Sequence, residues 1–181
     1  MKKTITSILL IVLLLTINST VYGYVDIPSG ISRFFYSKGY SYNAPLKVLN
    51  VYTSGTPAAD NLVTIYNWTD DPSQEWYIIS NDDIANVSSD SYRVASVAND
   101  NVALNYRQDT NGCTVYYFGS LNYYKDYPIG FESVTGGGYT IWLYYRDFYL
   151  GNTGSTNGSQ CLWKTEGNNG ISADDVWIMF N

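Results

Sequence analysis

The feature that most limits the fold of this chain is a series of short segments with alternating apolar residues. Apolar and polar residues alternate over Leu46–Tyr52 and Asn61–Trp68, and a third short segment, Glu75–Ile79, follows. A period of two residues is typical of β-strands that bury one face, and the Gly, Pro and Asp residues between the segments favour turns. No segment after Gly23 shows a convincing helical period over three turns. We therefore predict an all-β fold.

The first 23 residues have the pattern of a secretory signal peptide. Lys2 and Lys3 precede an apolar run centred on Leu9–Leu15, and small residues lead to Gly23. The run is shorter than the ~20 residues that a membrane-spanning helix needs. We expect a secreted protein cleaved near Gly23, without stable insertion into a membrane. A retained membrane anchor is the alternative.

The predicted mature chain is acidic and long enough for one domain. Cleavage leaves about 158 of the 181 residues, enough for a core of its own. The full chain has 10 Lys and Arg against 16 Asp and Glu, and loss of Lys2 and Lys3 changes its net charge from −6 to −8. Nucleic acids and anionic membranes are bound through basic surfaces. We therefore expect neither as a partner.

Residues 24–45 form an irregular segment before the alternating pattern begins. Pro, Gly and Ser residues interrupt the segment, which also contains a cluster of aromatic residues: Phe34, Phe35, Tyr36, Tyr40 and Tyr42. We predict an aromatic N-terminal arm that either packs across the domain or docks on another protein subunit. Docking is considered because clustered exposed aromatic residues mark contact sites.

A repeated spacing indicates three equivalent units. In each unit a leucine precedes an aromatic residue by 27 positions, the pairs being Leu49–Trp76, Leu104–Phe131 and Leu150–Trp177. Units of this size cannot bury their apolar faces alone and are stable only when they share a core. We predict that three four-stranded units surround a pseudo-threefold axis.

The first unit resembles a repeat of the ricin-type β-trefoil lectins, whose pattern is Leu-Asp-Val, then Val-x-Leu-Trp, then Gln-x-Trp. The matching residues are Leu49-Asn50-Val51, Val63-Thr64-Ile65-Tyr66 and Gln74-Glu75-Trp76, within about 30 residues. The other units match loosely, with Ile129-Gly130-Phe131 and Asp175-Val176-Trp177 in the last position.

The resemblance implies a fold and a class of function. It implies a β-trefoil domain over residues 46–181 that binds glycans on host or other cell surfaces without catalysis. An alternative function is that of a binding or carrier subunit of a multi-protein bacterial toxin, as in the A and C subunits of cytolethal distending toxins. The alternative fold is a βγ-crystallin-like Greek key, because Tyr144, Tyr149 and Gly151 fit its loose signature once.

The resemblance also implies which residues bind the sugar. In the first unit they are Asn50, Thr64, Tyr66, Ser73 and Gln74. An aromatic face stacks on the C–H face of a sugar while short polar groups bond its hydroxyls. Asn50 replaces a family Asp, and a neutral amide is a weaker acceptor than a carboxylate.

The other two units match this site less well. The second unit offers Asn105 with either Phe118 or Tyr117 as the aromatic residue, depending on register. In the third unit Gly151 has no side chain to hold a hydroxyl, and we expect no site there. That unit has two possible registers, one with Cys161 and Trp163 facing inward and one with Gln160 and Leu162 facing inward. The first is physically better, because it buries the less polar pair.

The numbers of cysteine and histidine residues limit which disulfide, catalytic and metal-binding chemistry the chain can support. An even cysteine count in an exported protein favours a disulfide between Cys113 and Cys161, with two buried thiols as the alternative. The absence of histidine excludes Ser–His, Cys–His and His-ligated zinc chemistry. The adjacent acidic pairs Asp82–Asp83 and Asp174–Asp175 are poorly placed for glycoside hydrolysis. We expect no enzyme activity, no metal and no cofactor.

Overall fold

The computed structural model describes residues 23–24, 27, 29–36, 46–118, 126–165, 172 and 175–180. The predicted signal peptide up to residue 22, together with Tyr40 and Tyr42, lies outside the described residues. The described part is built from short strands and includes a 3-10 turn, η2, at Pro72–Gln74. The strands are β1 Gly23–Tyr24, β2 Gly30–Tyr36, β3 Lys47–Val51, β4 Val63–Asn67, β5 Trp76–Ser80, β6 Tyr92–Ser96, β7 Asn99–Arg107, β8 Gly112–Tyr117, β9 Ile129–Ser133, β10 Tyr139–Leu143, β11 Phe148–Asn152, β12 Ser159–Thr165 and β13 Trp177–Phe180.

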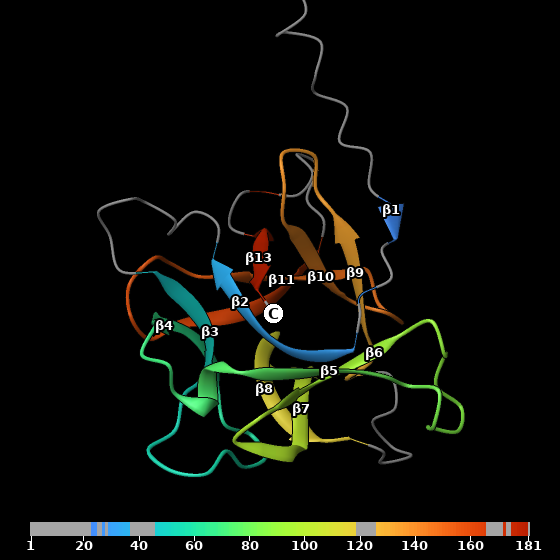
Figure 1. Ribbon diagram of the computed structural model, residues 1–181, viewed down its shortest axis with the longest axis horizontal. Helices are drawn as coiled ribbons and strands as arrows, with labels where there is room; N and C mark the ends of the chain where they lie inside the picture. Colours follow the sequence, from blue (N-terminus) through green and yellow to red (C-terminus); the bar gives the residue numbers. More distant parts are fainter. Residues whose placement is uncertain are drawn as a thin grey trace, which may run out of the picture.

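Six of these strands close into a barrel. Antiparallel pairs join β2 to β5, β5 to β6, β6 to β9, β9 to β10, β10 to β13, and β13 back to β2. Six more form three hairpins, β3–β4, β7–β8 and β11–β12, which meet one another through β4–β12, β12–β8 and a bridge between Leu62 and Thr114 (Figure 1). The short strand β1 pairs with β9. The chain is a β-trefoil. This confirms the predicted all-β class and excludes the Greek-key alternative.

Each unit of the trefoil contributes four consecutive strands: β2–β5, β6–β9 and β10–β13. The first unit therefore begins with β2, inside the segment that was predicted to be an arm. Phe34 and Tyr36 point into the core, and β2 pairs with β5 and β13. The predicted domain start at residue 46 is too late for this reason, because the barrel cannot close without β2.

Trp76 and Trp177 hold equivalent places in the first and third units. Each is the first residue of its unit's last strand, and each is fully buried. The indole N–H of Trp76 donates to the carbonyl of Leu49 at 3.2 Å, and that of Trp177 donates to the carbonyl of Leu150 at 2.8 Å. In both units, the leucine and the tryptophan that lie 27 positions apart in the sequence are therefore joined by a hydrogen bond.

In the second unit the predicted equivalence is wrong by two residues. The register places Ile129 opposite Tyr92 and Leu143, the position that a tryptophan holds in the other two units. Phe131 lies two residues further along β9, where it is buried and stacks on Phe34 with ring centroids 6.0 Å apart. The core is shared as expected, but the second unit closes on an aliphatic side chain.

The predicted disulfide is absent from this structure, in which Cys113 and Cys161 are buried free thiols. Their strands, β8 and β12, give them the register position that Val63 holds in β4. They fill the centre of the hairpin layer as small apolar groups, a common role for buried cysteine. Burial raises the pKa of both thiols, that of Cys113 strongly. As predicted, Cys161 and Trp163 both face inward.

Candidate functional site

Four of the five residues predicted for the first unit line one pocket. Asn50, Tyr66, Ser73 and Gln74 surround a hollow of about 260 Å³ together with Tyr52, Thr53, Thr69 and Asp71. Strand β3 and the two residues after it supply Asn50, Tyr52 and Thr53, and strand β4 supplies Tyr66. The segment that returns to Trp76 supplies Thr69, Asp71, Ser73 and Gln74. The hairpin and the return segment together make an open site on the surface of the unit.

Thr64 does not line this pocket. Its residue is only 2% exposed, because β12 pairs with β4 at this point, with Gln160 opposite Thr64. The neighbouring hairpin covers the side chain. Its assignment as a sugar contact is therefore wrong.

Gln74 has a structural task within the pocket. The side chain is 1% exposed; its Oε1 accepts from the backbone N–H of Thr69 at 2.9 Å, and its Nε2 donates to the carbonyl of Asn67 at 2.9 Å. Both ends of the amide are thus bonded to the return segment. Gln74 therefore fixes the shape of that segment, and the other side chains of the pocket are the ones available to contact a ligand.

Asp71 supplies the charged acceptor that the sequence appeared to lack. Its Oδ1 accepts from the backbone N–H of Ser73 at 2.8 Å, in the N-cap position of the turn Pro72–Gln74. The Ser73 hydroxyl donates to Oδ1 of Asn50 at 3.1 Å. The side chain and the backbone N–H of Ser73, which lie beside this carboxylate, hold the pKa of Asp71 below its usual value. Sequence reasoning missed Asp71, although an Asp-Pro pair before a short turn is a recognisable capping signal.

A second pocket occupies the equivalent place in the second unit. It has a volume of about 350 Å³ and is lined by Asp60, Asn105, Tyr106, Arg107, Gln108, Asp109, Tyr116 and Asp126. The strand register makes Asn105 and Tyr116 the counterparts of Asn50 and Tyr66. Asp126 precedes Ile129 by three residues, as Ser73 precedes Trp76, and is the counterpart of Ser73.

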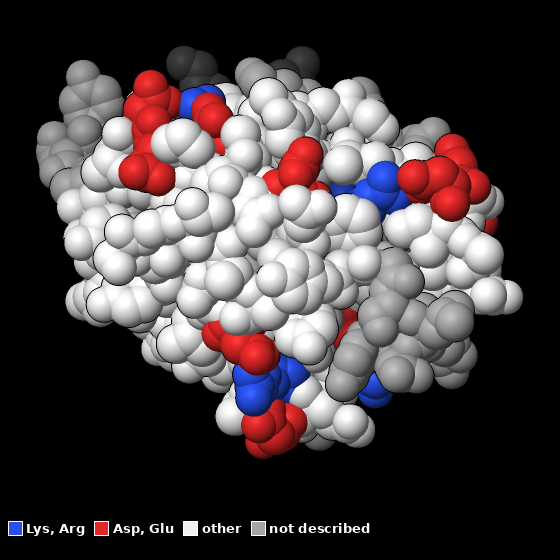
Figure 2. Space-filling view, turned by 90° about the horizontal axis from the view of Figure 1, so that it is seen from below, with Lys and Arg blue, Asp and Glu red and all other residues white. Residues whose placement is uncertain are grey.

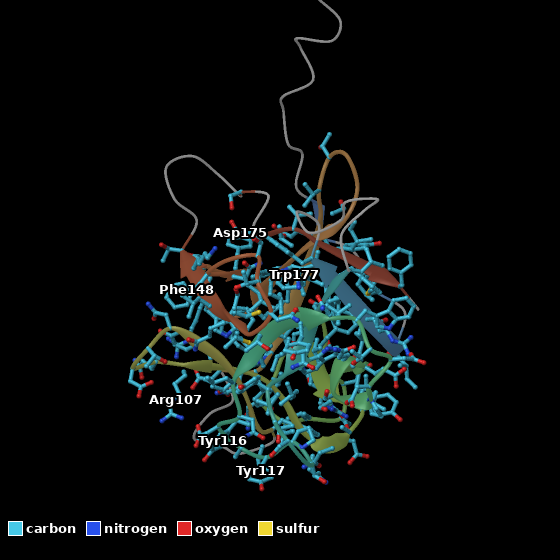
Figure 3. All side chains as sticks on the ribbon, turned by 90° about the vertical axis from the view of Figure 1, so that its left-hand side faces the viewer. Arg107, Tyr116, Tyr117, Phe148, Asp175 and Trp177 are labelled. Carbon is cyan, nitrogen blue, oxygen red and sulfur yellow. The ribbon has the colours of Figure 1, made fainter. Side chains whose placement is uncertain are left out.

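The aromatic residue of the second pocket is therefore neither of the two predicted. Phe118 packs against Tyr127 with ring centroids 6.3 Å apart and lies under the Arg93 guanidinium at 5.1 Å, away from the pocket. Tyr117 is 51% exposed and touches Tyr116 edge-on, but it lies outside the pocket lining. Figure 3 shows Tyr116, Tyr117 and Arg107 on one side of the molecule, away from Asp175. Of the residues predicted for this unit, Asn105 lines the pocket and Phe118 does not, because the β8 register places Tyr116 there instead.

Ion pairs brace the second pocket. Arg107 pairs with Asp60 and, at 3.2 Å, with Asp109. Arg146 pairs with Asp126 at 2.7 Å and lies over the ring of Tyr106 at 4.8 Å. On the face shown in Figure 2, most of the surface is uncharged and basic side chains mostly lie beside acidic ones. In that view the charged side chains form small groups, without a broad basic surface.

The third unit has a filled position where the other two have a pocket. Gly151 is the counterpart of Asn50 and Asn105, and a Cβ built on it would lie 2.1 Å from Oδ1 of Asp175 and 2.6 Å from Nζ of Lys164. These two side chains form an ion pair at 3.2 Å. Asp175 also accepts from the backbone N–H of Ser172 at 3.0 Å and from its hydroxyl at 2.8 Å. The charged pair occupies the space above the missing side chain.

In the part of the chain that the structure describes, the His, Cys, Asp and Glu side chains form no group of three or more that could hold a metal ion. Among these same residues there is no helix with the length and apolar character needed to cross a bilayer.

Solved structures that resemble this chain include β-trefoil lectins of low sequence identity. The Rhizoctonia solani agglutinin superposes with a TM-score of 0.63 at 13% identity, over 88% of this chain and 99% of the agglutinin. The Macrolepiota procera ricin B-like lectin, in complex with lactose, gives 0.61 at 11% identity, over 86% and 98%. A mosquitocidal holotoxin gives 0.66 at 14% identity, over 85% of this chain and 17% of the toxin chain. No protein-family model and no curated protein matches the sequence. Identities this low establish the shared fold alone.

Proposed function

We propose that this chain is a secreted, non-catalytic carbohydrate-binding protein that recognises glycans on cell surfaces. The observation that carries the proposal is the repetition of one arrangement in two pockets. Each pocket combines a strand asparagine, a tyrosine on the paired strand two residues beyond the asparagine's partner, and a carboxylate on the return segment. These residues are Asn50, Tyr66 and Asp71 in one pocket, and Asn105, Tyr116 and Asp126 in the other.

The chemistry of both pockets suits a sugar. A tyrosine ring offers an apolar face to the C–H groups of a pyranose, and Tyr66 is 37% exposed at the rim of its pocket. Amide and carboxylate oxygens accept hydrogen bonds from sugar hydroxyls. The complex of the similar Macrolepiota lectin with lactose supports a sugar as the ligand class. Export is supported by the basic and apolar residues that open the sequence.

The test is a glycan array followed by titration of lactose and of the best array ligand. We expect Tyr66→Ala and Tyr116→Ala each to weaken binding at its own pocket by about tenfold, the loss typical of a stacked aromatic contact. The double variant should not bind. Tyr117→Ala is the matched control, because Tyr117 is an exposed tyrosine beside Tyr116 that lies outside the pocket. Unchanged binding by the double variant would exclude these pockets as the sugar sites.

A binding subunit of a toxin is the second candidate, because a small aromatic surface lies on the barrel. The exposed rings of Trp68 and Phe180 meet Phe35 edge-on at 5.8 and 5.0 Å, and the similarity to a mosquitocidal holotoxin supports this setting. The test mixes the chain with proteins encoded beside it and measures co-elution. Trp68→Ala with Phe180→Ala should abolish co-elution and leave lactose binding intact. Co-elution that survives this change would place the contact elsewhere.

A further inference from the structure

The two pockets differ at one position in a way that changes which ligand each accepts. We propose that the second pocket selects a sugar carrying a protonated amine, whereas the first accepts a neutral sugar. This inference rests on the proposed function and names the ligand class of one of its sites. The difference lies in the counterparts Ser73 and Asp126.

In the first pocket the protein supplies its own hydrogen-bond donor. The Ser73 hydroxyl donates to Oδ1 of Asn50 at 3.1 Å, so the asparagine oxygen has a partner before any ligand arrives. A hydroxyl both donates and accepts. Among the described lining residues, Asp71 is the single charged side chain that this pocket offers to a ligand, and the others are neutral.

In the described part of the second pocket, Asp126 stands where the first pocket has the donating hydroxyl of Ser73. An ionised Asp126 only accepts hydrogen bonds. Asn105 is 8% exposed; its Nδ2 donates to the carbonyl of Tyr106 at 3.0 Å, and its Oδ1 bonds to no residue that the structure describes. Asn105 lines the pocket, so a ligand that carries hydrogen-bond donors can give this oxygen a partner.

The carboxylates of this pocket keep free acceptor atoms. Arg107 bonds Oδ1 of Asp60 and Oδ1 of Asp109, and Arg146 bonds Oδ1 of Asp126. In the described structure the second oxygen of each carboxylate bonds to none of the side chains around it. An ammonium group has three donors and a positive charge, and charge-assisted hydrogen bonds are about twice as strong as neutral ones.

The same charges act against an acidic sugar. Among the described residues, three carboxylates and one guanidinium line the pocket, and Arg107 is already shared between two of the carboxylates. A ligand carboxylate would meet more negative than positive charge. Because Asp60 and Asp109 are more than half exposed, solvent screens part of this effect, and we expect discrimination of several-fold per group.

The experiment titrates the isotope-labelled chain with glucosamine, N-acetylglucosamine and glucuronic acid at pH 6.5 and follows backbone NMR signals around Tyr116 and Tyr66. At the Tyr116 pocket we expect glucosamine to bind at least about fivefold more tightly than N-acetylglucosamine, with glucuronic acid weakest. The preference should shrink in 0.5 M NaCl, since salt screens charge. At the Tyr66 pocket glucosamine should hold no comparable advantage.

Exchange of the two counterparts provides the decisive variants. Asp126→Ser should remove the amine preference of the second pocket, and Ser73→Asp should create one in the first. Asp60→Asn with Asp109→Asn, at exposed positions, gives a further reduction should Asp126→Ser disturb folding through Arg146. Asp82→Asn, an exposed acid outside both pockets, is the control and should change nothing.

The outcomes separate this inference from the proposed function. Equal binding of glucosamine and N-acetylglucosamine at the Tyr116 pocket overturns the inference and leaves carbohydrate binding standing. An amine preference that survives both Asp126→Ser and the Asp60, Asp109 double change also overturns it. Absence of signal changes at either pocket with every sugar, together with a blank glycan array, removes the proposed function and this inference together.

Discussion

At the scale of single residues, the tryptophans differ in whether the indole N–H has a hydrogen-bond acceptor. Trp76 and Trp177 donate to buried carbonyls of Leu49 and Leu150, whereas the Nε1 of Trp142 is buried and has no hydrogen-bond partner in the described structure. The same Trp→Phe change therefore has opposite consequences. It strips a buried carbonyl of its donor at Trp76, and it removes an unsatisfied donor at Trp142.

We predict that Trp76→Phe lowers the free energy of unfolding by about 1–3 kcal/mol, through the unpaired Leu49 carbonyl and a smaller core side chain. Trp142→Phe is the matched control, and its free energy of unfolding should stay within about 1 kcal/mol of the unmodified chain. Urea unfolding followed by far-UV circular dichroism measures both. Equal losses in the two variants would show that ring volume, rather than the N–H bond, sets the cost.

Asp71 yields a prediction about pH. Hydrogen bonds from Ser73 lower its pKa below the ordinary 3.8, so the folded state binds a proton less readily than the unfolded state. Its stabilising contribution is therefore present above about pH 3.8 and is lost as the pH falls through the lower folded value. We expect the Asp71 carboxyl signal in carbon NMR to titrate below pH 3.8. Ser73→Ala should move that midpoint upward, because the Ser73 side chain is the largest cause of the shift and the backbone bond remains.

Thr53→Ala is the control for this titration. Thr53 lines the same pocket but is not among the causes of the shift. A midpoint that stays in place in Ser73→Ala would assign the shift to the backbone bond alone.

The residue scale also shows where the sequence was informative. Asn50, Tyr66 and Ser73 could be placed because the first unit keeps regular alternation and a Gln-x-Trp closure. Asp71 and Asp126 could not, because their positions depend on how the return segment folds over the hairpin. Thr64 was misassigned because alternation gives the face of a strand but not the neighbouring hairpin that covers it.

At the scale of elements, loop lengths explain the errors in the second unit. Leu104 pairs with Val115, 11 positions later, whereas Leu49 pairs with Ile65, 16 positions later. The shorter hairpin is only partly offset by a longer connection to β9. The equivalent of Trp76 is therefore Ile129, and the pocket tyrosine is Tyr116. The number of residues between the leucine and the closing residue of a unit includes two loops, and the lengths of these loops vary independently.

The third hairpin provides a prediction at the same scale. A methyl group on Gly151 would displace the Lys164–Asp175 ion pair that fills the space above it. We predict that Gly151→Ala lowers the free energy of unfolding by about 1–3 kcal/mol, the usual cost of overpacking. Gly55→Ala, where a Cβ would meet nothing within 4 Å, is the control and should be nearly neutral. A neutral Gly151→Ala in chemical denaturation would mean that the pair moves aside freely.

At the scale of the whole molecule, the first and last strands of the barrel are hydrogen-bonded to each other. Residues Trp177–Phe180 of β13 pair with Arg33–Tyr36 of β2, and β13 also pairs with β10. The barrel closes only when β13 pairs with β2. Contacts between such distant residues slow folding, because the chain must be closed into a loop before they form.

This closure leads to the last prediction, for a chain that stops after residue 175. The deletion removes β13, opens the edges of β2 and β10, and takes the indole of Trp177 out of the shared core. Three units that depend on one core cannot lose a wall and keep a cooperative transition. We expect urea unfolding of this chain, followed by tryptophan fluorescence and circular dichroism, to show no sigmoidal transition. A chain that ends at Phe180 is the control and should unfold as the complete chain does. A sharp transition in the chain that stops at 175 would mean that two units and part of the third form a stable core, and that the closed barrel is not the unit of folding.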